Sequence, residues 1–166
     1  MEWLIATPVR PVELVFGKLL PYMAIGFLDM VISVVAGVLI FAVPFKGDLI
    51  LLFILSTVFL GGALSMGLLI SIGTRAQLLA SQMAVVGSFL PSFLLSGFVY
   101  PIYNMPKALQ YVTYLVPTRY LIVIIKGIFL KGVGLAVLWP EALLLGMFGL
   151  LMIVLCIKLF KKRLAA

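Results

Sequence analysis

The sequence predicts an all-α integral membrane protein with four membrane-spanning helices. Hydrophobic residues make up 65% of the chain and charged residues only 10%, whereas a soluble domain carries roughly 25% charged residues. The mean hydropathy is +1.34. Apolar blocks long enough to cross a hydrocarbon core of ~30 Å alternate with short segments that carry charge, proline or glycine. No repeat or flexible linker divides residues 1–166, so we expect a single transmembrane domain.

Residues 1–19 form an amphipathic segment that precedes the first span. From Pro11 onward, apolar residues recur at the helical period, while Glu13 and Lys18 lie off that stripe. We expect this helix to lie along the membrane surface and to turn into the first span at Pro21. Two interpretations remain open, namely a plain interfacial anchor and a docking surface for a cytoplasmic partner.

The long apolar runs place the spans in order along the chain. The first, Leu20–Phe45, would be roughly 39 Å long as a helix and ends in a turn at residues 43–48 that combines proline, glycine and charge. The second is expected over Leu49–Gly73 and the third over Leu78–Tyr100. The last span is expected over Glu141–Leu159, where a basic cluster marks its end.

The segment between the third and fourth spans, residues 101–131, is the least regular part of the chain. Its apolar stretch Leu121–Leu130 is too short to cross a bilayer and fits a re-entrant or interfacial helix better. Upstream, Asn104 is a candidate N-cap for a short helix with Pro106 in its first turn. We therefore expect two short helices that dip in from outside and join the last two spans.

The distribution of Lys and Arg favours an orientation with both termini in the cytoplasm, in the cell (inner) membrane. Seven of the twelve basic residues fall on the side of the two termini and five on the opposite side. The first group comprises Arg10, Lys18, Arg75, Lys158, Lys161, Lys162 and Arg163. The second comprises Lys46, Lys107, Arg119, Lys126 and Lys131.

Composition also excludes several classes of function. The basic residues are scattered and form no basic face with interleaved aromatics, which argues against a nucleic-acid partner. The chain has no His, a single cysteine, Cys156, and five acidic residues far apart in sequence. We therefore expect no metal site, no catalytic residues and no enzymatic activity in this chain.

Two polar features inside the spans are candidates for a transport pathway. Asp29 stands about ten residues into the first span, where an acid costs roughly 2.5–3.5 kcal/mol on insertion scales. It either faces the bundle interior, hydrogen-bonded to Ser or backbone, or lines a pathway. Gln82 belongs to a polar side of the third span with Gln77, Ser81 and Ser88, and helix-to-helix hydrogen bonds explain that side as well as substrate contacts do.

A small-residue stripe in the second span predicts a close helix contact. Ala63, Gly67 and Ser71 are spaced four apart and fall on one face. Small residues at this spacing let a neighbouring helix approach closely, so we interpret them as packing residues and not as a ligand site.

Two separated motifs resemble those of type-two ABC exporter permeases. The segment Glu2–Leu14, with Gly17-Lys18 and Pro21-Tyr22, is similar to the loop between the second and third spans of that family. The segment from Leu95 through Asn104-Met105-Pro106 to Tyr120 is similar to the family's motif between the fifth and sixth spans. The resemblance covers nearly the whole chain.

The resemblance implies a partnership with a cytoplasmic ABC ATPase, which would bind ATP and Mg²⁺, and with a second permease subunit, identical or different. This chain itself would hold no cofactor, and membrane lipid would surround it. Residues 2–7 would form the coupling helix, and the short helices of residues 101–131 would lie at the outer end of the pathway. The coupling residues would be Glu2, Trp3, Thr7, Pro8, Arg10, Glu13 and Lys18. The pathway candidates are Asp29, Gln82, Gly97, Pro101, Pro117 and Tyr120.

The sequence departs from the family pattern at its beginning. A full permease has two further spans, whereas Met1 falls inside the coupling loop, so the chain resembles the C-terminal part of a permease. A truncated frame, a gene fragment or a split subunit would each produce this pattern. The alternative functions are a structural or assembly membrane protein, an inactive permease fragment, and an ion-coupled carrier that uses Asp29; no inverted repeat supports the last.

Overall fold

A computed structural model describes residues 11–74 and 76–164. No β-strand occurs in these ranges. Four stretches are long and apolar enough to cross a membrane, and this confirms the predicted number of spans: Val15–Leu39, Leu49–Gly73, Leu78–Leu95 and Leu135–Leu159. The elements in chain order are α1 (Pro11–Leu39), α2 (Leu49–Gly73), α3 (Gln77–Ala84), η2 (Val85–Phe89), α4 (Leu90–Leu95), η3 (Ile102–Asn104), α5 (Lys107–Thr113), α6 (Pro117–Lys126), η4 (Gly127–Lys131) and α7 (Leu135–Leu164).

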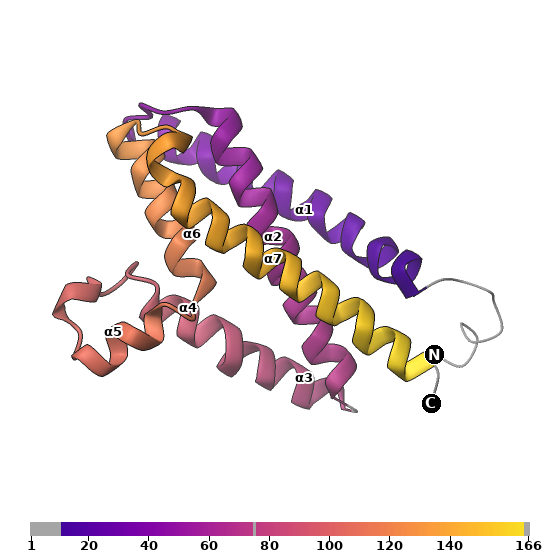
Figure 1. Cartoon of the computed structure of the whole chain (residues 1–166). Coiled ribbons are helices and arrows are strands. Elements are labelled where there is room, and N and C mark those ends of the chain that lie inside the picture. The colour runs from indigo at the N-terminus through magenta and orange to yellow at the C-terminus, as the bar shows by residue number, and fades with distance from the viewer. Residues whose placement is uncertain (1–10, 75, 165–166) are drawn as a thin grey trace.

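The three long helices α1, α2 and α7 run side by side, and the third span leaves the bundle at an angle (Figure 1). α1 begins at the end of the bundle where α7 ends, and the link between α2 and α3 lies at that end too. α6 rises beside α7 toward the opposite end, where the loop between α1 and α2 lies. The short helix α5 stands apart from the long helices.

The expected turn at Pro21 is wrong within the described residues, because α1 is one continuous helix of 29 residues with Pro21 inside it. Proline removes only one hydrogen bond, the one that its missing N–H would make to the carbonyl of Gly17. The helix continues for ten residues before Pro21 and eighteen after it, and in a membrane the other backbone groups must be satisfied internally. The amphipathic segment from Pro11 therefore continues straight into the first span.

Three helix ends differ from those expected. α1 stops at Leu39 and not at Phe45, since the chain leaves the helix through Ala42 in the left-handed region, with φ 49°. The third span stops at Leu95 and not at Tyr100, because Gly97 follows with φ 80°. α7 begins at Leu135, before Pro140, whereas the sequence suggested Glu141. Pro140 therefore lies inside α7, as Pro21 lies inside α1.

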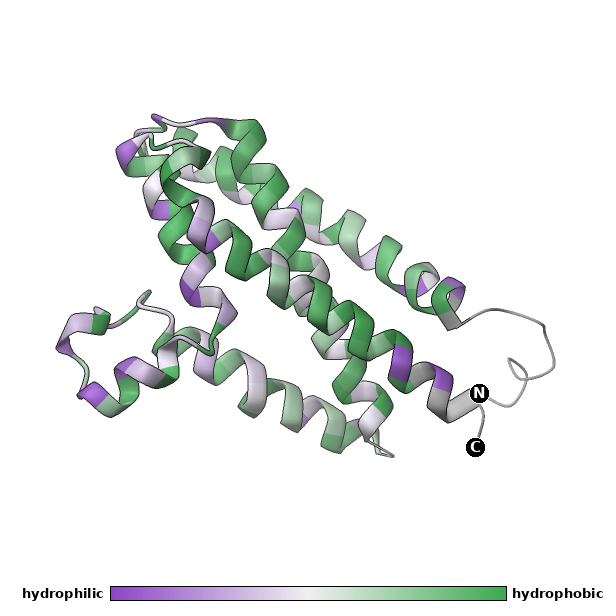
Figure 2. Ribbon diagram, viewed as in Figure 1, coloured by the Kyte–Doolittle hydropathy of each residue, from purple (hydrophilic) through white to green (hydrophobic). Residues whose placement is uncertain are grey.

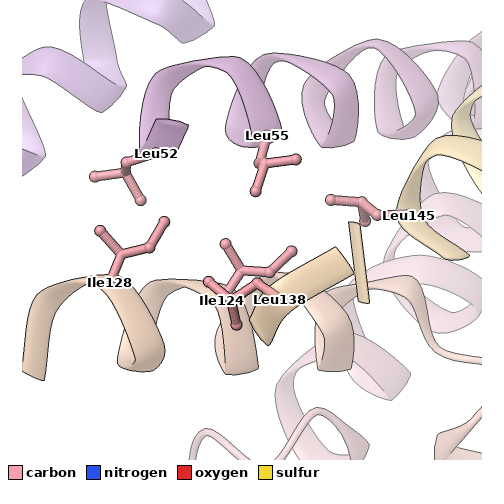
Figure 3. Packing of buried hydrophobic residues seen from close by; sticks show 6 residues of the cluster. All are labelled: Leu52, Leu55, Ile124, Ile128, Leu138 and Leu145. Carbon is pink, nitrogen blue, oxygen red and sulfur yellow. The ribbon is translucent and has the colours of Figure 1, made fainter. Parts of the chain in front are cut away.

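The main hydrophobic core lies where α2, α6 with η4, and α7 meet. It is formed by buried aliphatic side chains that point toward one another (Figure 3): Leu52, Leu55, Ile124, Ile128, Leu138 and Leu145. A second buried cluster joins the first turns of α1 to α7 through Val15, Leu19 and Cys156. The two clusters hold the three long helices together near both of their ends.

α2 and α7 approach each other closely at Gly62 and Gly149. A Cβ atom on Gly62 would lie 2.9 Å from the Gly149 Cα atom, which real Cβ atoms do not approach. The predicted stripe of Ala63, Gly67 and Ser71 is wrong as the contact face, because a Cβ atom on Gly67 would meet nothing within 4 Å and Ser71 is exposed. The face of α2 that contacts its neighbours instead carries the buried residues Gly61, Gly62 and Ser65.

The outer surface of the long helices is apolar, as a membrane requires. In Figure 2 the long helices α1, α2 and α7 are largely hydrophobic, and most hydrophilic residues lie near helix ends and on α5. In the most apolar windows of α1 and of the third span, no residue is buried within the chain. These surfaces are therefore suited to lipid or to protein partners.

Candidate functional site

The bent helix pair α5–α6 precedes the last span, as the sequence predicted. Lys107–Thr113 and Pro117–Lys131 meet at an angle of 85°. Pro117 explains the break, because proline pushes the preceding residue out of the helical region and is favoured at a helix start. Val116 accordingly has an extended backbone, with φ −90° and ψ 110°.

Arg119 holds the inside of this bend together. Its guanidinium donates a hydrogen bond to the hydroxyl of Thr113, which is buried. The same group lies over the ring of Tyr114, 3.8 Å from the ring centroid. Tyr120 donates its phenolic proton to the carbonyl of Tyr114 at 2.7 Å. Three contacts from the first turn of α6 thus converge on the last residues before the bend.

Two side chains of α6 attach it to the third span and the turn that follows. Thr118 donates a hydrogen bond to the hydroxyl of Ser92 in α4, with 2.8 Å between the oxygens. Eight residues later, the Lys126 ammonium donates to the carbonyl of Gly97 at 3.1 Å. α6 is therefore tied to the α4 segment at both of its ends.

The turn after α4 depends on glycine at position 97. Its left-handed φ of 80° is one that side chains rarely adopt, and a Cβ atom there would lie 3.0 Å from Ile102. Pro101 follows and precedes η3. The expectation that Asn104 caps α5 is wrong, since Asn104 lies in η3 and α5 has no side-chain cap. Gln110 instead donates to the carbonyl of Met105 at 2.8 Å.

The far end of α6 is held against the loop between α1 and α2. The Lys46 amide donates to the carbonyl of Phe129 at 3.2 Å, and the rings of Phe45 and Phe129 meet edge to face, with centroids 4.9 Å apart. Gly132 passes so close to this loop that a Cβ atom would lie 2.8 Å from the Lys46 carbonyl oxygen. The loop and η4 therefore form one packed unit.

A cavity of about 360 Å³ lies beside the bend, between α2, the third span, α6 and α7. Its walls are mostly apolar, and three hydroxyl groups, of Ser88, Ser92 and Thr118, lie among them. The full lining is Phe59, Ala63, Met66, Gly87, Ser88, Pro91, Ser92, Leu95, Val112, Leu115, Val116, Pro117, Thr118, Phe148 and Met152. None of these residues carries a charge.

The predicted pathway residues do not form a single site. Gly97, Pro101, Pro117 and Tyr120 all belong to the region of the bent pair and its turn. Gln82 is exposed on α3, and Asp29 is exposed on α1. The interior position considered for Asp29 is therefore not the one observed, and among the described residues no hydrogen bond or ion pair of its carboxylate is found.

The predicted coupling residues are only partly described. Glu13 is exposed and Lys18 half-buried, near the start of α1. The remaining five, Glu2, Trp3, Thr7, Pro8 and Arg10, lie outside the described residues. Within the described ranges, no three His, Cys, Asp or Glu residues come together as a metal site would require.

Sequence reasoning missed the residues that build the bend, namely Ser92, Thr113, Tyr114 and the contact role of Lys126. Lys126 did offer a signal, because a lysine that interrupts an apolar stretch needs a polar partner. Ser92 and Thr113 gave no such signal in the sequence, since Ser and Thr inside helices usually bond to the backbone of their own helix. Only the meeting of α4 and α6 in space identifies them.

Comparison of the sequence with known proteins places the chain in a family. Residues 1–158 match the family model described as "ABC-2 family transporter protein". The chain is 43% identical over 132 residues to the probable multidrug ABC transporter permease YbhS of Escherichia coli, covering 80% of this chain and 35% of that protein. It is 31% identical over 142 residues to the E. coli permease YbhR, covering 84% of this chain and 38% of that protein.

A more distant match reaches into eukaryotes. The ABC transporter G family member 20 of Dictyostelium discoideum is 27% identical over 135 residues, covering 81% of this chain and 18% of that protein. The chain thus spans little more than a third of the length of the bacterial relatives that it matches. No solved structure matches it.

Proposed function

The chain belongs to the ABC-2 family of transporter proteins, and from this premise we propose that it is the membrane-spanning part of an ATP-driven exporter. The family match over residues 1–158 carries the proposal. The bundle geometry supports it, because four apolar spans are combined with a bent helix pair and a cavity beside the bend. A separate cytoplasmic ATPase would bind ATP and Mg²⁺ and supply the energy, and a second permease subunit would complete the pathway.

We place the ATPase at the end of the bundle where α1 begins. Glu13 and Lys18 lie in the first two turns of that helix, and Lys158 and Lys161 lie near the end of α7 at the same end of the bundle (Figure 1). Basic residues beside span ends favour the cytoplasmic side. The proposed docking surface is residues 2–18, in the inner membrane of a cell with both termini in the cytoplasm.

The proposed substrates are lipophilic compounds. Two relatives carry the description "multidrug" in their names, and the cavity beside the bend has no charged lining residue. Exposed Asp29 stands away from that cavity, so we assign it no role in transport.

Transport in inside-out vesicles tests the proposal. Vesicles from cells that produce the chain with its ABC ATPase should accumulate a fluorescent lipophilic dye when ATP is added. Replacement of the phosphate-binding lysine of the ATPase should abolish that accumulation. Equal accumulation with the inactive ATPase would refute ATP-driven export and favour the structural or assembly role.

Docking is tested separately by co-purification of the ATPase. Lys18→Glu should weaken recovery of the ATPase, because it reverses a charge on the proposed docking surface. Lys158→Glu is the matched control, since it makes the same change at the same end of the bundle but outside residues 2–18. Equal recovery with both variants would contradict the assignment of the docking surface.

A further inference from the structure

We propose that the cavity beside the bend is a binding site, within a single copy of the chain, for an uncharged lipophilic molecule of about two rings that carries one hydrogen-bonding group. The idea that this molecule is exported rests on the proposed function, whereas its binding does not. Four parts of the fold contribute walls: α2, the third span, the α5–α6 bend and α7.

The volume of the cavity sets the size of the ligand. At about 360 Å³ it falls at the lower end of the range of roughly 300–1,000 Å³ typical of small-molecule sites. An apolar cavity of about 150 Å³ is enough to hold benzene. The space therefore suits a molecule of about two such rings.

The chemistry of the walls selects against charge. Phe59, Met66, Phe148 and Met152 contribute aromatic and thioether surface from α2 and α7, and methionine adapts to irregular ligand shapes. An ion brought into such walls would lose its hydration without gaining a counter-charge. A neutral ligand carries no such cost.

The hydroxyl groups give the site a polar wall on the side of the third span. Thr118 donates to Ser92, which leaves the Ser92 proton available, because a hydroxyl is both donor and acceptor. Among the described residues, no hydrogen bond of the Ser88 hydroxyl is found. A ligand hydroxyl or carbonyl could therefore accept a hydrogen bond from the hydroxyl group of Ser92 or of Ser88.

The π-helical turn η2 belongs to the same wall. Proline at position 91 has no N–H to donate to the carbonyl of Gly87, so the α-helical pattern cannot continue there. The helix widens instead, and the Leu90 amide bonds to the carbonyl of Val85, five residues earlier. Single π-turns of this kind occur often at functional sites. Gly87 and Pro91 both line the cavity.

Photolabelling tests the site without ATP or an ATPase, so its outcome is independent of export. The chain in liposomes would be irradiated with 4-[3-(trifluoromethyl)diazirin-3-yl]benzyl alcohol, which is uncharged and has one hydroxyl group. We expect labelling of residues 87–95 and 112–118 that excess 4-phenylphenol suppresses. Biphenyl, which lacks the hydroxyl, should compete about three- to tenfold less well, the value of one hydrogen bond.

Two variants would fill the cavity from opposite walls, Gly87→Phe and Ala63→Leu. Gly87 lines the cavity, and a Cβ atom there would meet nothing within 4 Å, so a larger side chain can enter this space without a backbone clash. Each variant should lower the suppressible labelling about tenfold or more, which corresponds to ~1.4 kcal/mol of lost binding. Gly67→Phe is the control, since that site on α2 is equally open but does not line the cavity.

Labelling that excess 4-phenylphenol does not suppress would overturn the proposal, because it would mean that lipid chains occupy the cavity or that the probe labels only lipid-facing surface. Suppressible labelling that persists unchanged in both cavity-filling variants would overturn it as well. Export that fails while the suppressible labelling remains would refute the proposed function and leave the binding site standing.

Discussion

Gly62 of α2 and Gly149 of α7 lie so close together that a methyl group on Gly62 has no room between the helices, and one on Gly149 would be tightly packed. A Cβ atom on Gly62 would meet the Gly149 Cα atom at 2.9 Å and the Phe148 ring at 2.9 Å, and one on Gly149 would lie 3.2 Å from the Val58 carbonyl oxygen. Without a strong hydrophobic force between helices in lipid, such close packing is a main source of helix association. The contact therefore fixes the distance between the two helices that frame both the core and the cavity.

Substitution of Gly62 by leucine should destabilise the bundle by about 1–3 kcal/mol, the usual cost of overpacking. The loss should appear as a lower midpoint of unfolding in a detergent titration. Gly67→Leu, one turn later on the same helix, should cost much less, because nothing lies within 4 Å of its Cβ position. If the two variants unfolded at the same midpoint, the assigned contact face would be incorrect.

The hydrogen bond between Thr118 and Ser92 should couple α6 to the third span by about 0.6 kcal/mol, the average for such bonds between membrane helices. A double-mutant cycle with Thr118→Val and Ser92→Ala measures this coupling. The cycle of Thr118→Val with Ser81→Ala, which lies on α3, is the control and should show additive effects. An additive Thr118–Ser92 cycle would argue against the bond.

Arg119→Lys should loosen the bend between α5 and α6. Lysine keeps the charge but lacks the planar guanidinium that stacks on Tyr114 while bonding to Thr113. Loss of the cation–π contact costs about 0.5–2 kcal/mol, depending on exposure. Spin labels on the exposed positions Tyr111 and Val123 should report a broader distance distribution, whereas Lys107→Arg should leave the distribution unchanged.

Cys156 provides a natural probe of the packing of α1. Its side chain is fully buried against Val15 and Leu19, so a thiol reagent should react with it slowly in the folded chain. Leu19→Ala should open this contact and raise the alkylation rate several-fold, because the cavity left by a deleted side chain is only partly closed by relaxation. Leu20→Ala, at an exposed neighbouring position, should leave the rate unchanged.

Asp29→Asn should leave export unchanged and make insertion of α1 more favourable. The carboxylate is exposed on the helix surface, and its burial in lipid costs roughly 2.5–3.5 kcal/mol. Insertion of α1 in microsomes, read by glycosylation of engineered sites on either side of it, measures the second effect. A loss of export in the variant with intact protein levels would restore the ion-coupled alternative.

The number and order of the spans follow from the sequence, because a membrane-spanning helix can be identified from the length and hydropathy of its segment. The helix ends were less predictable. Pro21 indicated a turn but lies inside α1, while the first and third spans end just before Ala42 and Gly97, which are in left-handed backbone. An alanine in that conformation carries no signal in sequence.

The candidate site was predictable in outline only. The bent pair followed from an apolar stretch too short to span, which is a local property. The bond between Thr118 and Ser92 joins residues 26 positions apart, and the contact of Gly62 with Gly149 joins residues still more distant in the chain. Which residues meet depends on how each helix is rotated about its own axis. A difference of one residue in the sequence turns the contact face by about 100°. The stripe at Ala63 and Gly67 failed for this reason.

α1 passes Pro21 without a break and joins one end of the bundle to the other as a single helix. Its 29 residues measure about 43 Å along the axis, about 13 Å more than the hydrocarbon core of ~30 Å. The loop beyond it is bonded to η4 through Lys46 and Phe129. The first turns of α1 and the loop that packs on the bent pair thus lie at the two ends of one helix that is longer than the hydrocarbon core is thick.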